Sequence, residues 1–256
     1  MKILLTNDDG IYSEGIQALK SQLDNIAEVI VIAPDRERST VGHAMTLHKP
    51  LRIRQVKVNG GSEGYSVSGT PADCVVIGLL EIMKHKRPDL VVSGINRGPN
   101  LGDDIIYSGT VSAAMEGAMR NIPSLAISIA AYEDFKFESA ALFTKNLISH
   151  LIKDNLPHNL ILNINVPNID YDRIEGIEIT KHGKRVYQDE LKIIYDPQGT
   201  AHYWLGGDLP EGKIEPDTDF EAIYNHKVSI TPLSLDLTNY NIMPKVKDWA
   251  KKWNLR

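Results

Sequence analysis

Two adjacent carboxylates near the amino terminus are the first residues in the sequence whose types and spacing suggest chemistry. A short apolar run, residues 2–6, leads directly into Asp8 and Asp9. From Gly15 onward apolar residues recur at helical spacing, and Ser13 stands at the position of a helix cap. Adjacent carboxylates repel each other unless a cation joins them. An isolated Asp-Gly turn is more often an ordinary polar turn. A cation site is therefore indicated only if other loops place further oxygen ligands next to these acids.

Three further polar loops follow or adjoin predicted strands, at residues 34–43, 93–102 and 107–110. In an open parallel sheet, ligands bind at the edge where the carboxyl ends of the strands meet. The first two loops add Ser39 and Asn96 to the paired acids. This set of hard oxygen donors suits Mg²⁺, Mn²⁺ or Ca²⁺ better than zinc. Asn96 is also a candidate contact for a bound phosphate.

A predicted helix start at Ser108, Gly109 and Thr110 adds a place for an anion. Free backbone amides at a helix start bind phosphate oxygens. Asn7 and Gly10 flank the paired acids, and we expect them to shape the turn, with Gly10 supplying a positive φ. They are included among the candidate phosphate-binding residues. A metal site beside an anion site predicts phosphate ester chemistry, with the paired acids as the catalytic groups.

Four other polar residues in these loops have two interpretations each. Arg36 either contacts the substrate or belongs to a solvated cluster of charges with its neighbours. His43 is a candidate general acid, although a loop histidine bonded to the backbone is the simpler expectation. Asn100 and Asp104 either support the site from behind or are surface groups, and the sequence leaves this open.

Composition and charge limit the classes of function. The chain has 256 residues, 42% of them hydrophobic, and a formal net charge of −5 without a basic block, which argues against a nucleic-acid polymer as partner. Its single cysteine, Cys74, forms no intrachain disulfide, and we expect it to be a small core residue in a cytoplasmic protein. Nothing resembles a signal peptide or a membrane span, so no membrane partner is expected.

Several common nucleotide-binding and hydrolase motifs are missing from the sequence. There is no P-loop motif, and Gly94, Gly98 and Gly102 are spaced by four rather than in the dinucleotide-binding pattern. No G-x-S-x-G nucleophile elbow occurs. The adjacent acids also differ from the D-x-D pair of haloacid-dehalogenase-type phosphatases.

The order of the predicted elements indicates an α/β fold. Strands and helices alternate through about residue 167, which predicts a three-layer, Rossmann-like and mostly parallel sheet with helices on both faces. The predicted strands are residues 2–6, 28–33, 65–68, 89–93, 124–129 and 160–166, and the predicted helices are residues 15–23, 72–84, 111–120 and 138–153. Further on, we predict a β-hairpin at residues 190–205, a polar loop at 206–219 and a strand at 227–233.

The motifs in combination resemble SurE, the survival protein E family of 5′/3′-nucleotidases. The resemblance covers nearly the whole chain in the family's order. It is carried by TNDDG (6–10), PDRERSTVGH (34–43), GTPADCV (69–75), SGINRGPNLGDDIIYSGTVSAAMEG (93–117), YWLGG (203–207) and SITPL (229–233). Two departures, Thr40 and Ser112, stand where small glycine-like residues are expected, and neither is a ligand position.

The resemblance implies a metal-dependent phosphomonoesterase that hydrolyses nucleoside 5′-monophosphates, with 3′-monophosphates as a further substrate. It implies one divalent metal ion per subunit, Mg²⁺, Mn²⁺ or Ca²⁺, held by Asp8, Asp9, Ser39 and Asn96. Either a water oriented by one of the acids or a covalent aspartyl-phosphate would carry the reaction. Activity on polyphosphate or on other small phosphoesters is the alternative, and a non-catalytic metal- and nucleotide-binding module is a third possibility.

The resemblance also implies one domain with two parts and an oligomeric assembly. Residues 1–170 form the α/β core with the active site, and residues 171–256 form a β-rich extension for oligomerisation. Family members are homodimers or homotetramers built partly by exchange of carboxy-terminal elements. The predicted hairpin places apolar side chains on one face that another subunit would cover, although packing within the chain is the simpler alternative. These side chains are Leu191, Ile193, Tyr195, Tyr203 and Trp204.

Overall fold

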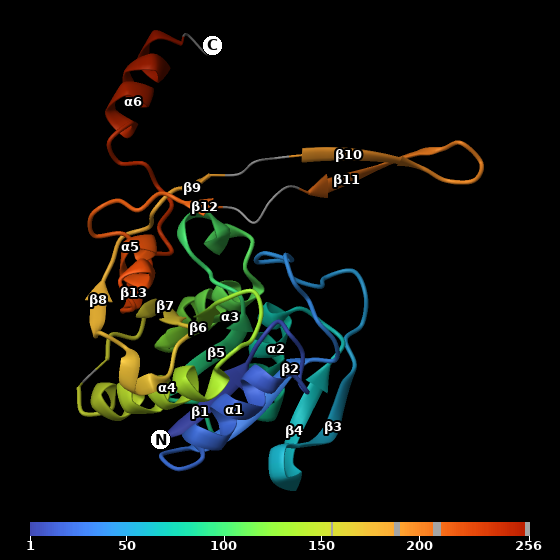
Figure 1. The fold of residues 1–256 in the computed structure, drawn as a ribbon, viewed down its shortest axis with the longest axis vertical. Helices are drawn as coiled ribbons and strands as arrows, with labels where there is room; N and C mark the ends of the chain where they lie inside the picture. Colours follow the sequence, from blue (N-terminus) through green and yellow to red (C-terminus); the bar gives the residue numbers. More distant parts are fainter. Residues whose placement is uncertain (155, 187–189, 207–210, 254–256) are drawn as a thin grey trace.

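A nine-stranded sheet in the order β3-β4-β2-β1-β5-β6-β7-β13-β8 forms the centre of the molecule (Figure 1). The computed structural model describes the chain except for residues 155, 187–189, 207–210 and 254–256. The strands of the sheet are β1 (Lys2–Thr6), β2 (Glu28–Pro34), β3 (Ile53–Val58), β4 (Ser62–Val67), β5 (Leu90–Arg97), β6 (Ser124–Ala130), β7 (Ile161–Pro167), β8 (Ile177–Ile179) and β13 (Val228–Pro232). Neighbours from β4 through β7 pair in parallel, whereas β3 and β13 pair antiparallel with their inner neighbours. The predicted, mostly parallel sheet is confirmed.

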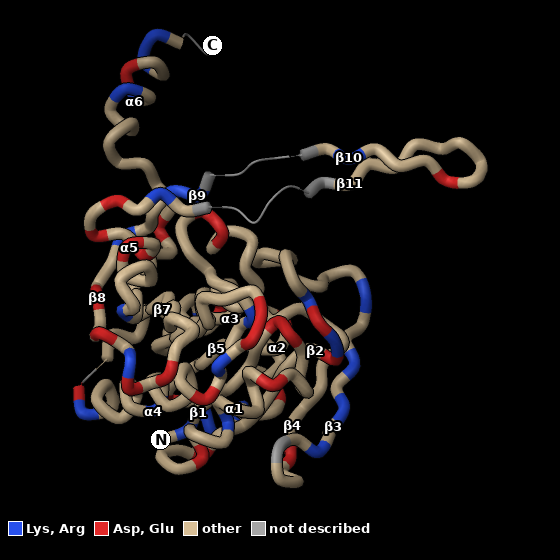
Figure 2. The backbone as a smooth tube through the Cα atoms, viewed as in Figure 1, with Lys and Arg blue, Asp and Glu red and all other residues tan. Residues whose placement is uncertain are grey.

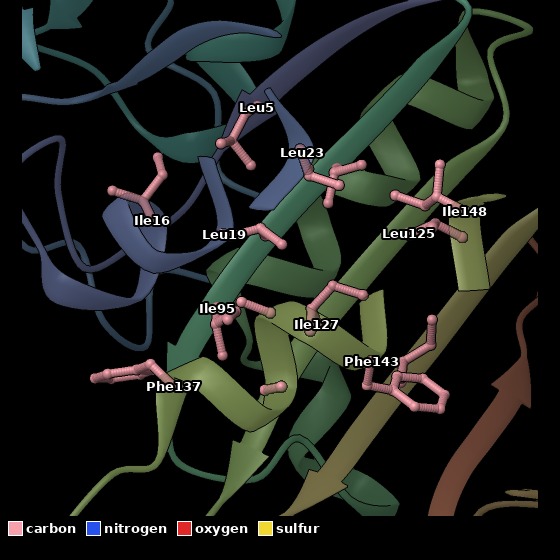
Figure 3. Close-up of a cluster of buried hydrophobic side chains, with 14 of the residues drawn as sticks. Leu5, Ile16, Leu19, Leu23, Ile95, Leu125, Ile127, Phe137, Phe143 and Ile148 are labelled. Carbon is pink, nitrogen blue, oxygen red and sulfur yellow. The ribbon is translucent and has the colours of Figure 1, made fainter. Parts of the chain in front are cut away.

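Helices cover both faces of this sheet, as predicted. Helices α1 (Glu14–Leu23) and α4 (Phe137–Leu151) pack on one face, and α2 (Pro71–Ile77) and α3 (Gly109–Met119) pack on the other. Successive side chains of β1 point to opposite faces, so Leu5 belongs to the first cluster and Leu4 to the second. Figure 3 shows the first cluster, in which side chains of α1 and α4 meet Leu5, Leu125 and Ile127 of the sheet. Cys74 is fully buried in the second cluster, as expected.

Short helical turns join several of these elements, namely η1 (Asn59–Gly61), η2 (Gly78–Ile82), η3 (Gly102–Ile106) and η4 (Tyr171–Arg173). The helix predicted over residues 72–84 is helical through Ile82, but its second half, η2, is a π-helical turn rather than α-helix. Thr70 caps α2 by accepting from Asp73 N, but the chain then widens into a π-helical turn in which Met83 N donates to Gly78 O at 2.7 Å. Strand β3 was not predicted, because an exposed edge strand lacks the apolar pattern of a buried one.

The carboxy-terminal extension, residues 171–256, contains more structure than the sequence predicted. The hairpin is present as β10 (Glu190–Tyr195) and β11 (Ala201–Gly206), and we call it the arm. The predicted polar loop instead contains β12 (Glu211–Gly212), which pairs with β9 (Arg185–Val186), and its residues 207–210 lie outside the described residues. Helices α5 (Asp219–Tyr224) and α6 (Met243–Lys252) correct the expectation of only a loop and a strand after the hairpin. Over the residues described, no helix has the length and apolar character to cross a membrane.

The arm projects from the body of the chain (Figures 1 and 2). Its apolar side chains face solvent. The exposed fraction reaches 70% for Tyr195 and 66% for Trp204. Ile193 stands opposite Tyr203, whereas Trp204 stands opposite Lys192. Directly opposed residues share a face, so the prediction of a single apolar face is wrong for Trp204, which lies on the other side. The arm therefore offers apolar groups on both of its faces.

Gly15 sets how closely α1 approaches the end of β5. A Cβ atom at this position would lie far inside contact distance of the Ile95 carbonyl oxygen and 3.2 Å from Cε1 of Phe137. Alanine gains about 1 kcal/mol in helix propensity over glycine. Displacing a neighbouring backbone costs about 1–3 kcal/mol or more in a packed core, so the steric cost prevails.

We therefore expect Gly15→Ala to lower the melting temperature by about 2–4 °C for each kcal/mol of net destabilisation. Scanning calorimetry measures this, with Ser21→Ala, at an exposed position of α1, as the matched control. A Gly15→Ala protein as stable as the wild type would contradict the close approach.

Candidate metal and phosphate site

The sheet reverses its direction of winding between β1 and β5. The chain runs from β1 outward to β2 and β4 on one side, and then crosses to β5 on the other side of β1. Ligands of open parallel sheets bind at such a switch point, beyond the carboxyl ends of the strands. Asp8 and Asp9 follow the end of β1, and Asn96 lies at the end of β5. The topology thus brings three of the predicted site residues to adjacent strand ends.

The acid turn, residues 7–10, is shaped by Asn7 and Gly10, and the predicted role of both in its geometry is confirmed. The fully buried Asn7 donates to Gly10 O at 3.0 Å and accepts from Gly10 N at 3.2 Å. Gly10 has a φ of +99°, and a Cβ there would lie 3.1 Å from the backbone of Arg36. Ser13 stands at the cap position of α1 as predicted, but its hydroxyl accepts from Asn7 at 2.7 Å instead of capping the helix.

The start of α3 holds the Asp8 carboxylate. Both the hydroxyl and the backbone N–H of Thr110 donate to Asp8, the latter at 3.2 Å. Gly109 allows this approach, because a Cβ there would lie 2.8 Å from Cβ of Asp8. Burial raises the pKa of Asp8, and the hydrogen bond from the Thr110 side chain opposes that rise. Ser108 caps the helix by accepting from Val111 N at 3.1 Å. Contact of Ser108, Gly109 and Thr110 with phosphate stays a prediction.

The pKa of Asp9 is raised by its surroundings. Burial first, and the neighbouring charge of Asp8 second, raise the pKa of Asp9 to about 6. The backbone N–H of Arg97 donates to Asp9 at 3.2 Å and favours the ionised form. The buried carboxylate of Asp8 and the partly buried one of Asp9 resist joint ionisation and suit a divalent cation, which would favour the charged form of both.

Neutral oxygens complete the candidate donor set. Across the residues described, no three or more His, Cys, Asp or Glu side chains form a metal-binding group, so a cation here must use hydroxyl or amide oxygens as well. Arg38 N donates to Asp8 O at 2.7 Å and brings the loop that carries Ser39 against the acid turn. Asn96 donates through its amide nitrogen to Gly98 O at 2.9 Å, and its amide oxygen is the atom that a hard cation binds.

Glu37 is a third acidic group at the site, and the sequence offered it only as part of a solvated cluster. Its charge raises the pKa values of Asp8 and Asp9, and its carboxylate accepts from the Ser39 hydroxyl at 2.6 Å. Arg36 in the same cluster is exposed. Thr40, where the family resemblance led us to expect a glycine-like residue, has a φ of 54°.

His43 and Glu116 link this loop to α3. Nε2 of His43 lies 2.9 Å from Oε2 of Glu116, so the expectation that His43 bonds to the backbone is wrong. Glu116 is 3% exposed and also accepts from Arg120 at 2.8 Å. The hydrogen bond from His43 is the main cause that lowers the pKa of Glu116.

Asn100 and Asp104 are both engaged behind the site. Asn100 is buried, its N–H donates to Asn165 at 2.8 Å, and its side chain donates to Ser128 at 2.7 Å. Asp104 pairs with Arg185 of the extension at 2.5 Å. No sequence signal points to these three partners, because Ser128 and Asn165 lie inside buried strands and Arg185 follows a segment without periodicity.

A cavity of about 720 Å³ lies at the other end of the strands, near the amino ends of β5 and β6 and away from the candidate site. Leu90, Ile122 and Ile148 contribute to its lining, and no residue of the candidate site does. The chemistry-bearing groups and this apolar cavity are therefore separate features.

Known proteins match nearly the whole of this chain. The family model described as Survival protein SurE matches residues 3–189. Proteins named 5′-nucleotidase SurE are 46% identical in Desulforudis audaxviator, over 99% of this chain and 99% of the relative, and 44% identical in Heliobacterium modesticaldum, over 97% and 92%. A crystal structure of the SurE protein from Aquifex aeolicus superposes with a TM-score of 0.85 at 43% identity, covering 98% of this chain and 100% of that one. The chain belongs to the SurE family.

Proposed function

We propose that this protein is a metal-dependent phosphomonoesterase that hydrolyses nucleoside 5′-monophosphates to nucleoside and phosphate. The observation that carries the proposal is the burial of Asp8 and Asp9 side by side at the switch point, with both pKa values raised. The activity named for the relatives supports the substrate class. A cytoplasmic location belongs to the same proposal, because a single cysteine needs no oxidising compartment.

Four residues form the proposed metal site. Asp8 and Asp9 supply charge, and Ser39 and Asn96 supply neutral oxygens, for one Mg²⁺, Mn²⁺ or Ca²⁺ per subunit. Bound there, such a cation supplies Lewis-acid chemistry, because it neutralises charge that develops on the phosphoryl group.

Residues around the metal site orient the acids, the attacking water and the phosphate. Thr110 fixes the orientation of Asp8, and the hydrogen bonds between Asn7 and Gly10 hold the turn that carries both acids. Asp9 orients the attacking water, since the hydrogen bonds from Thr110 already engage Asp8. At the start of α3, Thr110 N already donates to Asp8 and Val111 N to the Ser108 hydroxyl, so the Gly109 amide is the backbone donor proposed for a phosphate oxygen.

The test of the proposal is phosphate release over a panel of nucleoside monophosphates, sugar phosphates and polyphosphate. We expect the highest kcat/KM for a nucleoside 5′-monophosphate and no release in excess EDTA. Asp8→Asn should lower the rate by about 10²-fold or more, since it removes charge from the metal and phosphate site.

Ser39→Ala and Asn96→Ala serve as graded comparisons for this experiment. Each removes a neutral donor and leaves both acids in place, so each should reduce release less than Asp8→Asn does. Full activity of the wild type in EDTA would refute the metal, and a trapped phosphate on Asp8 would refute the water route.

Metal affinity should depend on pH. The pKa of Asp9 is raised to about 6 in the metal-free protein, so its carboxyl is largely ionised at pH 7 and largely protonated at pH 5. Because the cation binds the ionised form, we expect the Kd for Mn²⁺ to rise about tenfold or more from pH 7 to pH 5. Isothermal titration at the two pH values measures this, with Asp9→Asn as the control that should lose much of the dependence. Equal affinities at both pH values would contradict the arrangement.

The arm supports a proposed homodimer or homotetramer. Its exposed apolar residues on both faces are a large surface for a monomer to leave in water. The charged residues between positions 191 and 206 are Lys192 and Asp196, so little opposes close contact with a second copy. Symmetric contact of the arm with a neighbouring subunit would bury this surface.

Deleting residues 191–203 should therefore give smaller, aggregation-prone particles, whereas the site at Asp8 and Asp9 should still bind Mn²⁺. Light scattering measures the particle mass, and titration measures the metal. A wild-type protein that remains monomeric at micromolar concentration would exclude the assembly.

A further inference from the structure

The segment between Asn96 and Ser108 joins the two halves of the candidate site. Asn96 is a proposed metal ligand, and Ser108 begins the helix proposed to receive phosphate. Between them the chain passes through η3, which starts at Gly102, six residues from either end. Asn100 is fixed from the sheet by Asn165 and Ser128. What fixes Gly102 comes from the carboxy-terminal extension.

Asp219 binds three backbone amides from separate parts of the chain. One carboxylate oxygen accepts from Gly102 N at 2.7 Å, and the other accepts from Gly183 N at 2.8 Å and from Phe220 N at 3.0 Å. The residue is fully buried. A buried carboxylate is costly unless it is hydrogen-bonded, and charge-assisted bonds of this kind are strong. Asp219 therefore holds η3 and the segment at Gly183, just before β9, at a fixed separation.

The ring of Phe220 packs into the same junction. A Cβ at Gly102 would lie 3.0 Å from the ring and 2.8 Å from Gly183 O, and a Cβ at Gly183 would lie 2.5 Å from the ring. A Cβ at Gly212 in β12 would overlap the ring outright. The guanidinium of Arg185 lies 5.7 Å from the centre of the ring. The junction is filled closely, so η3 has no room to shift toward the extension.

We infer that Asp219 is a positioning residue for the candidate site, acting through Gly102 on the segment that carries Asn96 and Ser108. The inference rests on the proposed function. Residues 1–170 supply every group of the candidate site, yet one anchor of its central loop lies 117 residues further along the chain. An error of about 1 Å in the placement of reacting groups costs about 10²-fold in rate, so loss of this anchor should reach the chemistry.

Asp219→Asn is the direct test. Its side-chain amide replaces one accepting oxygen by a donor, so it cannot accept from both Gly102 N and Gly183 N. We expect kcat for a nucleoside 5′-monophosphate to fall about 10- to 100-fold, with a smaller change in KM. The Kd for Mn²⁺, measured by isothermal titration without substrate, should rise at least about threefold, because Asn96 lies at the other end of the same segment. Both measurements are made where circular dichroism shows the variant to be folded.

Two control variants separate positioning from general destabilisation. Asp217→Asn makes the same chemical change two residues away, on a side chain that is 80% exposed, and should leave kcat and the Mn²⁺ Kd unchanged. Ile148→Ala opens the core of α4 beside the cavity at the other end of the strands and should lower the melting temperature. It should nevertheless keep the wild-type kcat and Mn²⁺ Kd at a temperature where it is folded.

Gly102→Ala changes the other partner of the same contact. If Asp219→Asn does not fold, this variant tests whether the contact positions the candidate site. The new methyl group would meet Gly183 O and the ring of Phe220, so it should lower kcat and weaken Mn²⁺ binding as well. The double variant should be scarcely worse than the single variants, because both break one contact.

The inference is overturned if the folded variants keep wild-type kcat and Mn²⁺ affinity, or if Ile148→Ala at a matched loss of melting temperature gives the same losses. Failure of the proposed function gives a different result. A wild-type protein that releases no phosphate would refute the phosphatase, while the Mn²⁺ titrations would still decide whether Asp219 positions the site.

Discussion

The structure depends on keeping two adjacent carboxylates, Asp8 and Asp9, buried together at the end of β1. Burial first, and the neighbouring charge of Asp8 second, raise the pKa of Asp9 from 3.8 to about 6, which corresponds to about 3 kcal/mol against its ionisation. Backbone and side-chain donors offset part of this cost, from Thr110 to Asp8 and from Arg97 to Asp9. The acid turn can take its shape only because Asn7 satisfies the backbone of Gly10. A bound cation would offset the rest of this electrostatic cost.

The parallel sheet supplies donors from several directions at once. The loop after β2 reaches the acids through Arg38, β5 reaches them through Arg97, and α3 points its first turn at Asp8. Each contact joins residues far apart in sequence, which only a switch point with neighbouring strand ends allows. Behind the loop, the buried side-chain amides of Asn163 and Asn165 bond the backbone N–H and carbonyl of Asn100 and so hold that part of the loop in one place.

The sequence was informative where chemistry and periodicity coincide. The apolar run before Asp8 and the buried strand before Asn96 predicted that these residues follow neighbouring parallel strands, which the structure confirms, and alternation predicted the arm. It was uninformative where a role depends on a distant partner. Thr110 was predicted as a phosphate contact, and its bonds to Asp8 join residues 102 positions apart. His43 had two interpretations for the same reason, since its partner Glu116 reaches it only in the folded chain.

A division of the chain based on sequence pattern, near residue 170, differs from one based on contacts between residues. Alternating strands and helices cease near residue 167, and a β-rich segment without that rhythm follows. Yet Arg185 pairs with Asp104, and Phe220 occupies space that Gly102, Gly183 and Gly212 leave open. A glycine whose missing side chain makes room for a distant aromatic ring produces no periodic pattern in the sequence. An aspartate that accepts hydrogen bonds from distant backbone amides, as Asp219 does, looks in the sequence like an ordinary residue at a helix start. The loop behind the candidate site is consequently held from both parts of the chain, and the extension is part of the structure that shapes it.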